Sequence, residues 1–325
     1  MITVFNRREL ITLSSQQKLF AVRQALWDAD IDSQTGIPGM LGFGDRQFIM
    51  MRCIPILYMC IRKICTARSR CFKVCSSIGN RGRRYDTMNR IDGRMFDELR
   101  SVKITPGFAE FAEGSVLIEC GHTKVLCCAS VEDRVPPHVP MGEGWITAEY
   151  SMLPRANRER SRRDVSKLKL SPRSAEIQRL VGRSLRAAVD LKKLGEHTIT
   201  IDCDVLQGDG GTRTASVTGG YLALALACRK LLEEGLIAQD PMLGYVAGVS
   251  AGIVDDRALL DLCYSEDSRA MVDLNCVMND RGELIELQGT GEGRAFTVGE
   301  QQDLVRLCAK GVDELIAIQK EILQK

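Results

Sequence analysis

Residues 88–325 are predicted to form an α+β (mixed α/β) fold, and three patterns support this prediction. Residues 115–131 have the pattern of a β-hairpin, residues 173–190 carry apolar side chains at helical spacing, and residues 198–206 alternate with the period of a strand. The predicted order is hairpin, loop, helix, strand, helix, strands and helix. This order argues against a doubly wound parallel sheet, in which strands and helices alternate regularly.

The first expected elements are a hairpin and a long loop. Strands are expected at residues 115–120 and 124–131, with a turn at 121–123. Residues 132–170 show little periodicity and contain three prolines between 136 and 140, so loops are expected there.

A helix, a strand and a second helix are expected next. The helix at 173–190 follows from its apolar positions, which are Ile177, Leu180, Val181, Leu185 and Val189. The strand at 198–206 leads through a glycine-rich turn at 208–211 into a long apolar helix at 212–234.

Four strands and a closing helix complete the expected fold. Thr297 and Glu300 have the spacing of a capping box, which predicts the start of the closing helix. The strands are expected at 243–253, 258–264, 271–278 and 283–288, and the helix at 297–324.

The composition is that of a globular protein with two differently composed pieces. Of the 325 residues, 45% are hydrophobic and 26% are charged, which excludes disorder throughout and a collagen-like chain. The formal net charge of +2 hides an asymmetry. Residues 1–87 hold 14 basic and 6 acidic side chains, a net charge of +8, whereas residues 88–325 have a net charge of −6.

Residues 1–87 are interpreted as an upstream extension outside the folded core, with Met88 as the natural start. A zinc site is not favoured, because the spacing is irregular among Cys53, Cys60, Cys65, Cys71 and Cys75. The apolar stretch 47–65 is interrupted by charges and is too short to cross a bilayer, so no membrane association is expected. An organelle transit segment fits poorly with Asp28, Asp30, Asp32 and Asp45.

The cysteines predict a reducing compartment. There are 13 of them, and eight are scattered among the apolar residues of 88–325. Buried thiols in the cytoplasm fit this scatter better than a disulfide framework. Secretion is not expected, because the opening MITVFNRREL lacks a basic segment followed by an apolar one.

A basic loop is the first feature that suggests chemistry. Only Glu159 and Asp164 oppose its basic side chains, which are Arg155, Arg158, Arg160, Arg162, Arg163, Lys167, Lys169 and Arg173. Arginine forks match phosphate oxygens, and a flexible basic loop suits a nucleic-acid backbone. A solvated charged loop without a ligand is the alternative.

The glycine-rich turn 208–213 (GDGGTR) is the second feature. Glycines let the backbone approach a ligand closely, and the N-terminus of the following helix offers N–H groups to an anion. Thr212 and Arg213 add a hydroxyl and a charge. Neither GK[ST] nor GxGxxG is present in this turn, which argues against a nucleotide-dependent enzyme. A phosphate site and a simple capped turn both remain open.

Asp261 and Asp267, with Asp273 further on, are the third feature. Asp261 falls within a predicted apolar strand, where a carboxylate must be paired, hydrogen-bonded or metal-bound. Two carboxylates beside phosphates would suit Mg²⁺, and a surface-exposed pair is the alternative. No nucleophile elbow accompanies these residues, so a covalent mechanism is not favoured.

Six long stretches resemble one known family. They are RIDGRMFDELR (90–100), GSVLIECGHTKVLCCASVEDRVPP (114–137), GWITAEYSMLPRA (144–156), EIQRLVGRSLRAAVD (176–190), IDCDVLQGDGGTRTASVTGG (201–220) and ELQGTGEGRAF (286–296). Residues 88–325 are similar to bacterial ribonuclease PH, whereas residues 1–87 match nothing in that family. The resemblance implies a ribonuclease PH-type βαβ fold with sheets flanked by helices, a core at 97–235 and a C-terminal part at 240–312.

The resemblance also implies an activity. It implies a phosphorolytic 3′→5′ exoribonuclease, also described as a reversible tRNA nucleotidyltransferase. Such an enzyme trims tRNA precursors, with ribosomal RNA as a further substrate, and releases nucleoside 5′-diphosphates. Inorganic phosphate, the co-substrate, is expected to bind Arg173, Gly211, Thr212 and Arg213. Asp261 and Asp267 are expected to serve catalysis and hold Mg²⁺. RNA is expected to contact Arg155, Arg158, Arg160, Arg162 and Arg163.

A ring assembly is the last implication of the resemblance. A homo-oligomer is expected, a hexamer built as a trimer of dimers, in the cytoplasm. A non-catalytic ring subunit or RNA-binding module on the same fold is the alternative. Such a subunit would be free to lose Asp261, Asp267 or Arg213, and all three are present.

Overall fold

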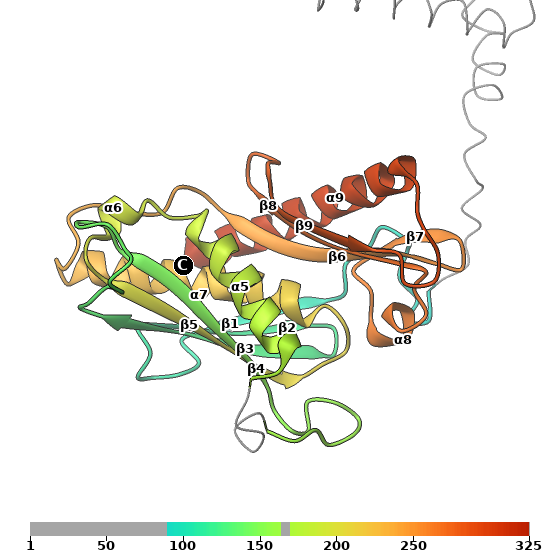
Figure 1. The fold of residues 1–325 in the computed structure, drawn as a ribbon, viewed down its shortest axis with the longest axis horizontal. Coiled ribbons are helices and arrows are strands. Elements are labelled where there is room, and N and C mark those ends of the chain that lie inside the picture. Colours follow the sequence, from blue (N-terminus) through green and yellow to red (C-terminus); the bar gives the residue numbers. More distant parts are fainter. Residues whose placement is uncertain (1–89, 164–169, 325) are drawn as a thin grey trace, which may run out of the picture. The chain divides into compact units, whose positions relative to one another are not determined.

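The computed structural model describes residues 90–163 and 170–324 (Figure 1). The chain divides into the units Met1–Tyr85 and Asp86–Lys325, and the described residues belong to the second. In chain order, the helices and strands are β1 (Val102–Pro106), β2 (Gly114–Cys120), β3 (Thr123–Glu132), β4 (Trp145–Met152), α5 (Pro172–Arg186), α6 (Leu191–Leu194), β5 (Thr198–Gln207), α7 (Thr212–Glu233), β6 (Val246–Val254), β7 (Arg257–Leu260), α8 (Tyr264–Asp267), β8 (Val272–Asn279), β9 (Leu284–Thr290) and α9 (Val298–Leu323).

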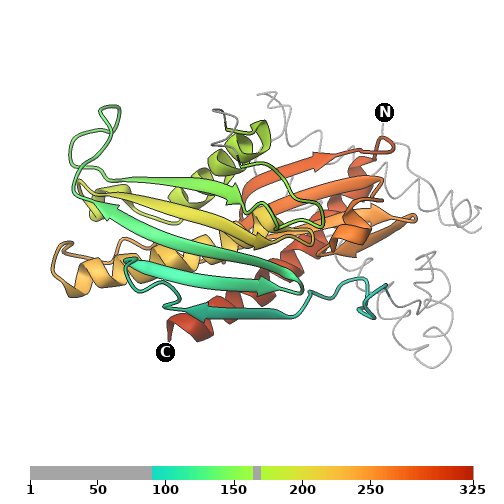
Figure 2. The ribbon, with the colours of Figure 1, turned by 90° about the horizontal axis from the view of Figure 1, so that it is seen from below.

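Five strands form the first sheet, in the order β1-β2-β3-β5-β4 (Figure 2). The β4–β5 pair is parallel and the other pairs are antiparallel. The predicted β2–β3 hairpin is confirmed, with Cys120 opposite Thr123 at its turn. This mixed sheet, packed against helices, confirms the predicted α+β class.

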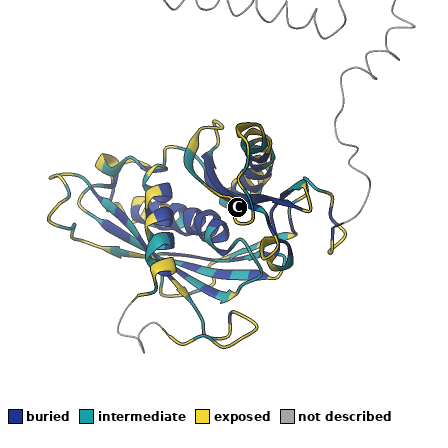
Figure 3. Ribbon diagram, turned by 45° about the vertical axis from the view of Figure 1, so that its right-hand side comes forward, coloured by how far each residue is buried: buried dark blue, intermediate teal, exposed yellow. Residues whose placement is uncertain are grey.

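Helix α7 packs between the two sheets. Nearly every residue of its first five turns is buried, as expected for a helix that is apolar or small on all sides (Figure 3). Strand β2 approaches it so closely that a Cβ at Gly114 would lie 2.1 Å from the Ala223 carbonyl oxygen. On its other side, the Gly248 N–H of β6 donates to the Thr218 hydroxyl at 3.0 Å. These close contacts fix the position of α7 between β2 and β6.

The second sheet has the order β7-β6-β8-β9, and α9 covers it. All nine residues of β6 are buried, because this strand lies between α7 and α9. The predicted capping box at the start of α9 is confirmed. The Glu300 N–H donates to the Thr297 hydroxyl at 3.2 Å, and the Thr297 N–H donates to the Glu300 carboxylate at 2.8 Å.

Two expectations about secondary structure were wrong, and three elements, β1, α6 and α8, were not predicted. Strand β4 lies inside 132–170, where loops were expected, and its buried residues Ile146, Ala148 and Tyr150 alternate. Strand β1 was not expected at all. Strand β7 ends at Leu260 instead of 264, because Asp261 has a left-handed backbone (φ 51°) and α8 begins at Tyr264.

The thiols of the described residues behave as expected. All eight are free, seven are buried and Cys128 is half-buried. The cysteines at 53–75 lie outside the described residues. Within the part of the chain that the structure describes, no helix is both long and apolar enough to span a membrane.

Candidate functional site

A polar pocket of about 320 Å³ lies where α5, α7, α8 and the strands β6 and β8 meet. Its lining residues are Arg173, Gly211, Thr212, Arg213, Ser250, Asp267, Ser268, Ala270, Asp273, Asn275 and Glu292. The structure therefore brings together the four residues expected to bind phosphate. It also places two carboxylates, those of Asp267 and Asp273, in the same pocket.

The glycine turn forms the wall at the start of α7. Gly210 and Gly211 both have left-handed backbones, with φ of 78° and 63°. A Cβ at Gly210 would lie 2.5 Å from the Leu262 carbonyl oxygen, so the residue must be glycine. Gly211 is the N-cap of α7. The first N–H groups of a helix have no intrahelical acceptor, and they suit an anion at this wall.

Arg213 is held by two residues from other elements. Its Nη1 donates to Gln288 Oε1 of β9 at 2.5 Å and lies 3.7 Å from Glu176 Oε1 of α5. Gln288 Nε2 in turn donates to Glu176 Oε1 at 2.6 Å. The Arg213 side chain is only 15% exposed, so an anion in the pocket would interact with its guanidinium more strongly than in bulk water.

Thr212 is oriented by a buried tyrosine. Its hydroxyl lies 2.8 Å from the hydroxyl of Tyr150, which projects from β4. Both side chains are buried, so this hydrogen bond sets the rotamer of Thr212 at the edge of the pocket. Neither Tyr150 nor Gln288 was expected from the sequence as a site residue.

Asp267 and Asp273 form the acidic part of the pocket. Burial, followed by the charge of Asp267, raises the pKa of Asp273 to about 6. Burial also raises the pKa of Asp267, although Arg173 and Arg213 act in the opposite direction. Asn275 Nδ2 donates to Asp273 Oδ2 at 3.0 Å and fixes that carboxylate.

The acidic side chains of the pocket offer part of a donor set for a hard divalent cation. Asp267, Asp273 and Glu292 offer carboxylate oxygens to the pocket, and oxygen ligands are those that Mg²⁺ prefers. Burial and the charge of Asp267 raise the pKa of Asp273, and a cation would offset the repulsion between the two carboxylates. Among the described residues, no three His, Cys, Asp or Glu side chains are grouped closely enough to hold a metal ion, so Asp267 and Asp273 would need water or substrate oxygens to complete the coordination of Mg²⁺.

Asp261 is placed differently from the expectation. It does not line the pocket, and its two carboxylate oxygens accept from the fork of Arg100, at 3.0 Å from Nε and 2.7 Å from Nη2. Burial alone would raise the pKa of Asp261, but the charge and hydrogen bonds of Arg100 lower it below the ordinary value. The expected Asp261–Asp267 pair therefore does not share the pocket: Asp261 is paired with Arg100 inside the protein, and the aspartate beside Asp267 in the pocket is Asp273.

The basic loop follows β4, and its described arginines reach solvent. Arg155, Arg158, Arg160, Arg162 and Arg163 are all exposed. Arg162 and Arg163 also line a second pocket of about 410 Å³, which shares Arg173 with the first. Lys167 and Lys169 lie outside the described residues. The exposed arginines therefore lead toward the candidate phosphate site.

Two family models match the chain. The 3′ exoribonuclease family, domain 1, matches residues 98–230, and domain 2 of the same family matches residues 244–307. The chain belongs to the 3′ exoribonuclease family. The expected resemblance to ribonuclease PH is thereby confirmed. The pocket takes Arg173, Thr212 and Arg213 from the first matched region of this exoribonuclease-family chain, and Asp267 and Asp273 from the second.

Solved structures of similar fold include exosome proteins. The chain is 26% identical to an archaeal exosome core protein, with a TM-score of 0.58, over 71% of this chain and 91% of the other. An Archaeoglobus fulgidus exosome structure with RNA bound to the active site matches with 26% identity and a TM-score of 0.58, over 70% and 91%. Rice (Oryza sativa) Rrp46 has the same fold at 16% identity, with a TM-score of 0.59 over 72% and 100%.

Proposed function

We propose that this protein is a phosphorolytic 3′→5′ exoribonuclease that trims the 3′ ends of tRNA precursors, with ribosomal RNA as a further substrate. Inorganic phosphate would attack the terminal phosphodiester, and a nucleoside 5′-diphosphate would leave. One observation carries the proposal. Two arginines, a helix N-terminus and two carboxylates line a single pocket, which suits an anionic nucleophile beside an anionic backbone.

Electrostatic repulsion between phosphate and RNA is the obstacle that such a site must overcome. Arg173 and Arg213 place fixed positive charge at the pocket, and the start of α7 adds oriented N–H donors. Glu176 and Gln288 keep Arg213 in place before the substrate arrives. These groups would hold phosphate in position for attack and stabilise the charge that develops on it.

Asp267 and Asp273 would hold Mg²⁺. The ion would supply positive charge to the leaving 3′ oxygen. No histidine lines the pocket among the described residues. None is required for activation of the nucleophile, because inorganic phosphate already carries ionised oxygens at neutral pH.

The basic loop would bind the RNA substrate. Arg155, Arg158, Arg160, Arg162 and Arg163 would contact phosphates of the acceptor stem and the 3′ end. Arg173 lines both pockets, so RNA bound in the second pocket would reach the phosphate pocket at this residue. The similar exosome structure with RNA bound to its active site supports an RNA substrate.

The proposed assembly is a homohexamer, a trimer of dimers, that acts in the cytoplasm. Similarity to exosome core proteins supports a ring assembly. The free thiols of the described residues suit a reducing compartment. Light scattering of the purified protein would test the assembly, and a mass of six 36.0 kDa chains is expected.

The activity is tested with a tRNA that carries a short 3′ extension. The purified protein is incubated with Mg²⁺ in the presence and absence of inorganic phosphate, and the released nucleotides are separated by charge. Nucleoside diphosphates that form only with phosphate are expected. Monophosphates formed without phosphate would indicate hydrolysis, and tRNA that is bound but not shortened would indicate a binding-only ring subunit.

A further inference from the structure

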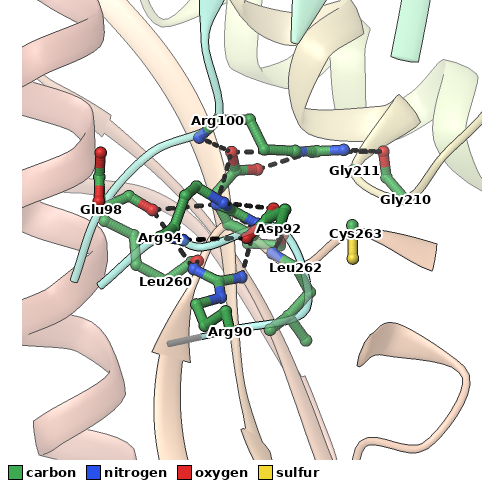
Figure 4. A network of polar contacts seen from close by, with 12 residues as sticks. Arg90, Asp92, Arg94, Glu98, Arg100, Gly210, Gly211, Leu260, Leu262 and Cys263 are labelled. Carbon is green, nitrogen blue, oxygen red and sulfur yellow. Dashed lines mark hydrogen bonds and ion pairs between the residues drawn. The ribbon is translucent and has the colours of Figure 1, made fainter. Parts of the chain in front are cut away.

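A buried network of hydrogen bonds joins the segment 90–100 to the glycine turn and to α8, which both contribute residues to the pocket. Three arginines of this segment are at most 9% exposed: Arg90, Arg94 and Arg100. A buried guanidinium must satisfy its donors within the protein. Some acceptors belong to the segment itself, and Arg94 Nη2 has no hydrogen-bond partner among the described residues. The others lie in the glycine turn, in residues 260–261 and in α8, close to the candidate phosphate and metal ligands (Figure 4).

Arg100 connects Asp261 to the glycine turn. One edge of its fork binds the Asp261 carboxylate, and the Arg100 N–H donates to the same carboxylate at 2.8 Å. Its Nη1 reaches the carbonyl oxygen of Asp209 at 2.6 Å and that of Gly210 at 3.4 Å. Asp261 therefore fixes the direction in which Arg100 presents its donors to the turn.

Thr123 holds the same turn from the first sheet. Its hydroxyl donates to the Gly210 carbonyl oxygen at 2.7 Å and accepts from the Asp209 N–H at 2.9 Å. Thr123 is completely buried at the start of β3. The turn is thus held by the side chains of both Arg100 and Thr123, directly before the pocket residues Gly211 and Thr212.

The network also reaches α8, which carries the acidic pocket residue Asp267. Arg90 binds both carboxylate oxygens of Glu266 in α8, and Glu266 is the neighbour of Asp267. The Tyr264 N–H at the start of α8 donates to the Asp209 carbonyl oxygen at 3.2 Å. The turn that carries the phosphate residues and the helix that carries Asp267 are therefore connected through Asp209.

We propose that Arg100 and Thr123 are positioning residues for phosphate, and that Asp261 acts through Arg100 and does not bind the metal. The proposal rests on the proposed function of the pocket. Loss of either side chain would free the carbonyl oxygens of Asp209 and Gly210. The start of α7 would then present its N–H groups less well to phosphate, while Asp267 and Asp273 would keep their cation.

The test measures binding of inorganic phosphate by titration calorimetry, without Mg²⁺, in the full-length protein. Thr123→Val and Arg100→Lys are expected to weaken phosphate binding about tenfold, because each removes hydrogen bonds to the turn. Thr123→Ser keeps the hydroxyl and is expected to stay within about twofold of the wild type. If Arg100→Lys fails to fold, the valine and serine variants still decide the question.

A matched control separates positioning from general loss of stability. Arg186→Lys removes the fork of a half-buried arginine that donates to the Ile146 carbonyl oxygen and stacks on Trp145, away from the pocket lining. Its phosphate affinity is expected to be unchanged. A folded Thr123→Val variant with wild-type phosphate affinity would overturn the proposal.

Asp261 is tested by binding of two separate probes. Asp261→Asn is expected to weaken phosphate binding and to leave Mn²⁺ binding unchanged, whereas Asp267→Asn is expected to weaken Mn²⁺ binding. Loss of Mn²⁺ binding with intact phosphate binding in Asp261→Asn would show that Asp261 is a metal ligand. Wild-type protein that binds phosphate but releases no nucleoside diphosphate would contradict the proposed function alone.

Discussion

Arg213 has the most direct part in the proposed chemistry. Its guanidinium lies in the pocket, largely shielded from solvent, and is fixed by Gln288 and Glu176. A charge held in this way needs no rearrangement when the transition state forms. Arg213 was predicted from the sequence, but Gln288 was not, because its partner Glu176 is 112 positions away in the chain.

Replacement of Arg213 by alanine is expected to slow phosphorolysis by about 10²- to 10³-fold, the scale seen when a preorganised charge-stabilising group is lost. The measurement is the rate of nucleoside diphosphate release at saturating RNA and phosphate. Arg183→Ala is the control, since Arg183 is half-exposed on α5 and pairs with Glu286. A near wild-type rate for Arg213→Ala would remove Arg213 from the mechanism.

Asp273 is expected to make the proposed metal binding dependent on pH. Its pKa of about 6 means that it is mostly ionised at pH 7 and mostly protonated at pH 5. A proton competes with the cation, so Mn²⁺ affinity is expected to fall about tenfold between pH 7 and pH 5. Asp273→Asn should bind Mn²⁺ weakly at both values. Equal wild-type affinity at pH 5 and pH 7 would contradict this assignment.

At the scale of elements, α7 connects the sheets and the site. Its buried surface packs on β2, β3 and β6, and its first residues line the candidate phosphate pocket. The helix and the glycine turn before it were predicted from apolar content and turn chemistry. Thr123 and Arg100 hold this turn in position. Their contacts could not be predicted, because they depend on which distant segments of the chain lie side by side in the fold.

The contact between β2 and α7 is expected to tolerate no added methyl group. Gly114→Ala would place a Cβ 2.1 Å from the Ala223 carbonyl oxygen and 2.8 Å from the Ala227 nitrogen. The free energy of unfolding is expected to fall by about 3 kcal/mol. Gly299→Ala in the first turn of α9 is the matched control, since its Cβ would meet only Thr297 Oγ1 at 3.8 Å. Denaturant unfolding measures both, and equal stabilities would contradict the packing described.

The first sheet carries a repulsive acidic pair on its face toward the second pocket. Glu149 lies directly opposite Asp202 in the parallel β4–β5 pair, and both line that pocket. Burial, then the charges of Glu149 and Asp204, raises the pKa of Asp202. A carboxyl with a raised folded-state pKa destabilises the fold when ionised, and this cost is relieved as the pH falls from 7 toward the ordinary carboxyl range.

Asp202→Asn is therefore expected to stabilise the protein at pH 7, by roughly 0.5 kcal/mol. The gain should shrink as the pH is lowered, because the wild-type carboxyl becomes protonated. Denaturant unfolding of the wild type, Asp202→Asn, Glu149→Gln and the double variant would measure the coupling. A destabilised Asp202→Asn variant would mean that this carboxylate makes a favourable interaction at pH 7.

At the scale of the whole molecule, the two regions matched by the family models both contribute residues to one pocket. Arg173, Thr212 and Arg213 come from the first region, and Asp267 and Asp273 from the second. The sequence predicted the class of fold from local periodicity, whereas the phosphate-binding roles of the pocket residues rest on the family resemblance and stay predictions. It selected Asp261 over Asp273, because spacing alone does not show that Asp261 is already paired with Arg100.

The measurement that tests the central claim most directly follows the phosphate itself. RNA with a 3′ extension is incubated with the protein, Mg²⁺ and inorganic phosphate labelled with ³²P. The account predicts label in the β-phosphate of every released nucleoside diphosphate, in amounts equal to the nucleotides removed. Unlabelled nucleoside monophosphates would show that water is the nucleophile and would contradict the assignment of the pocket to phosphate.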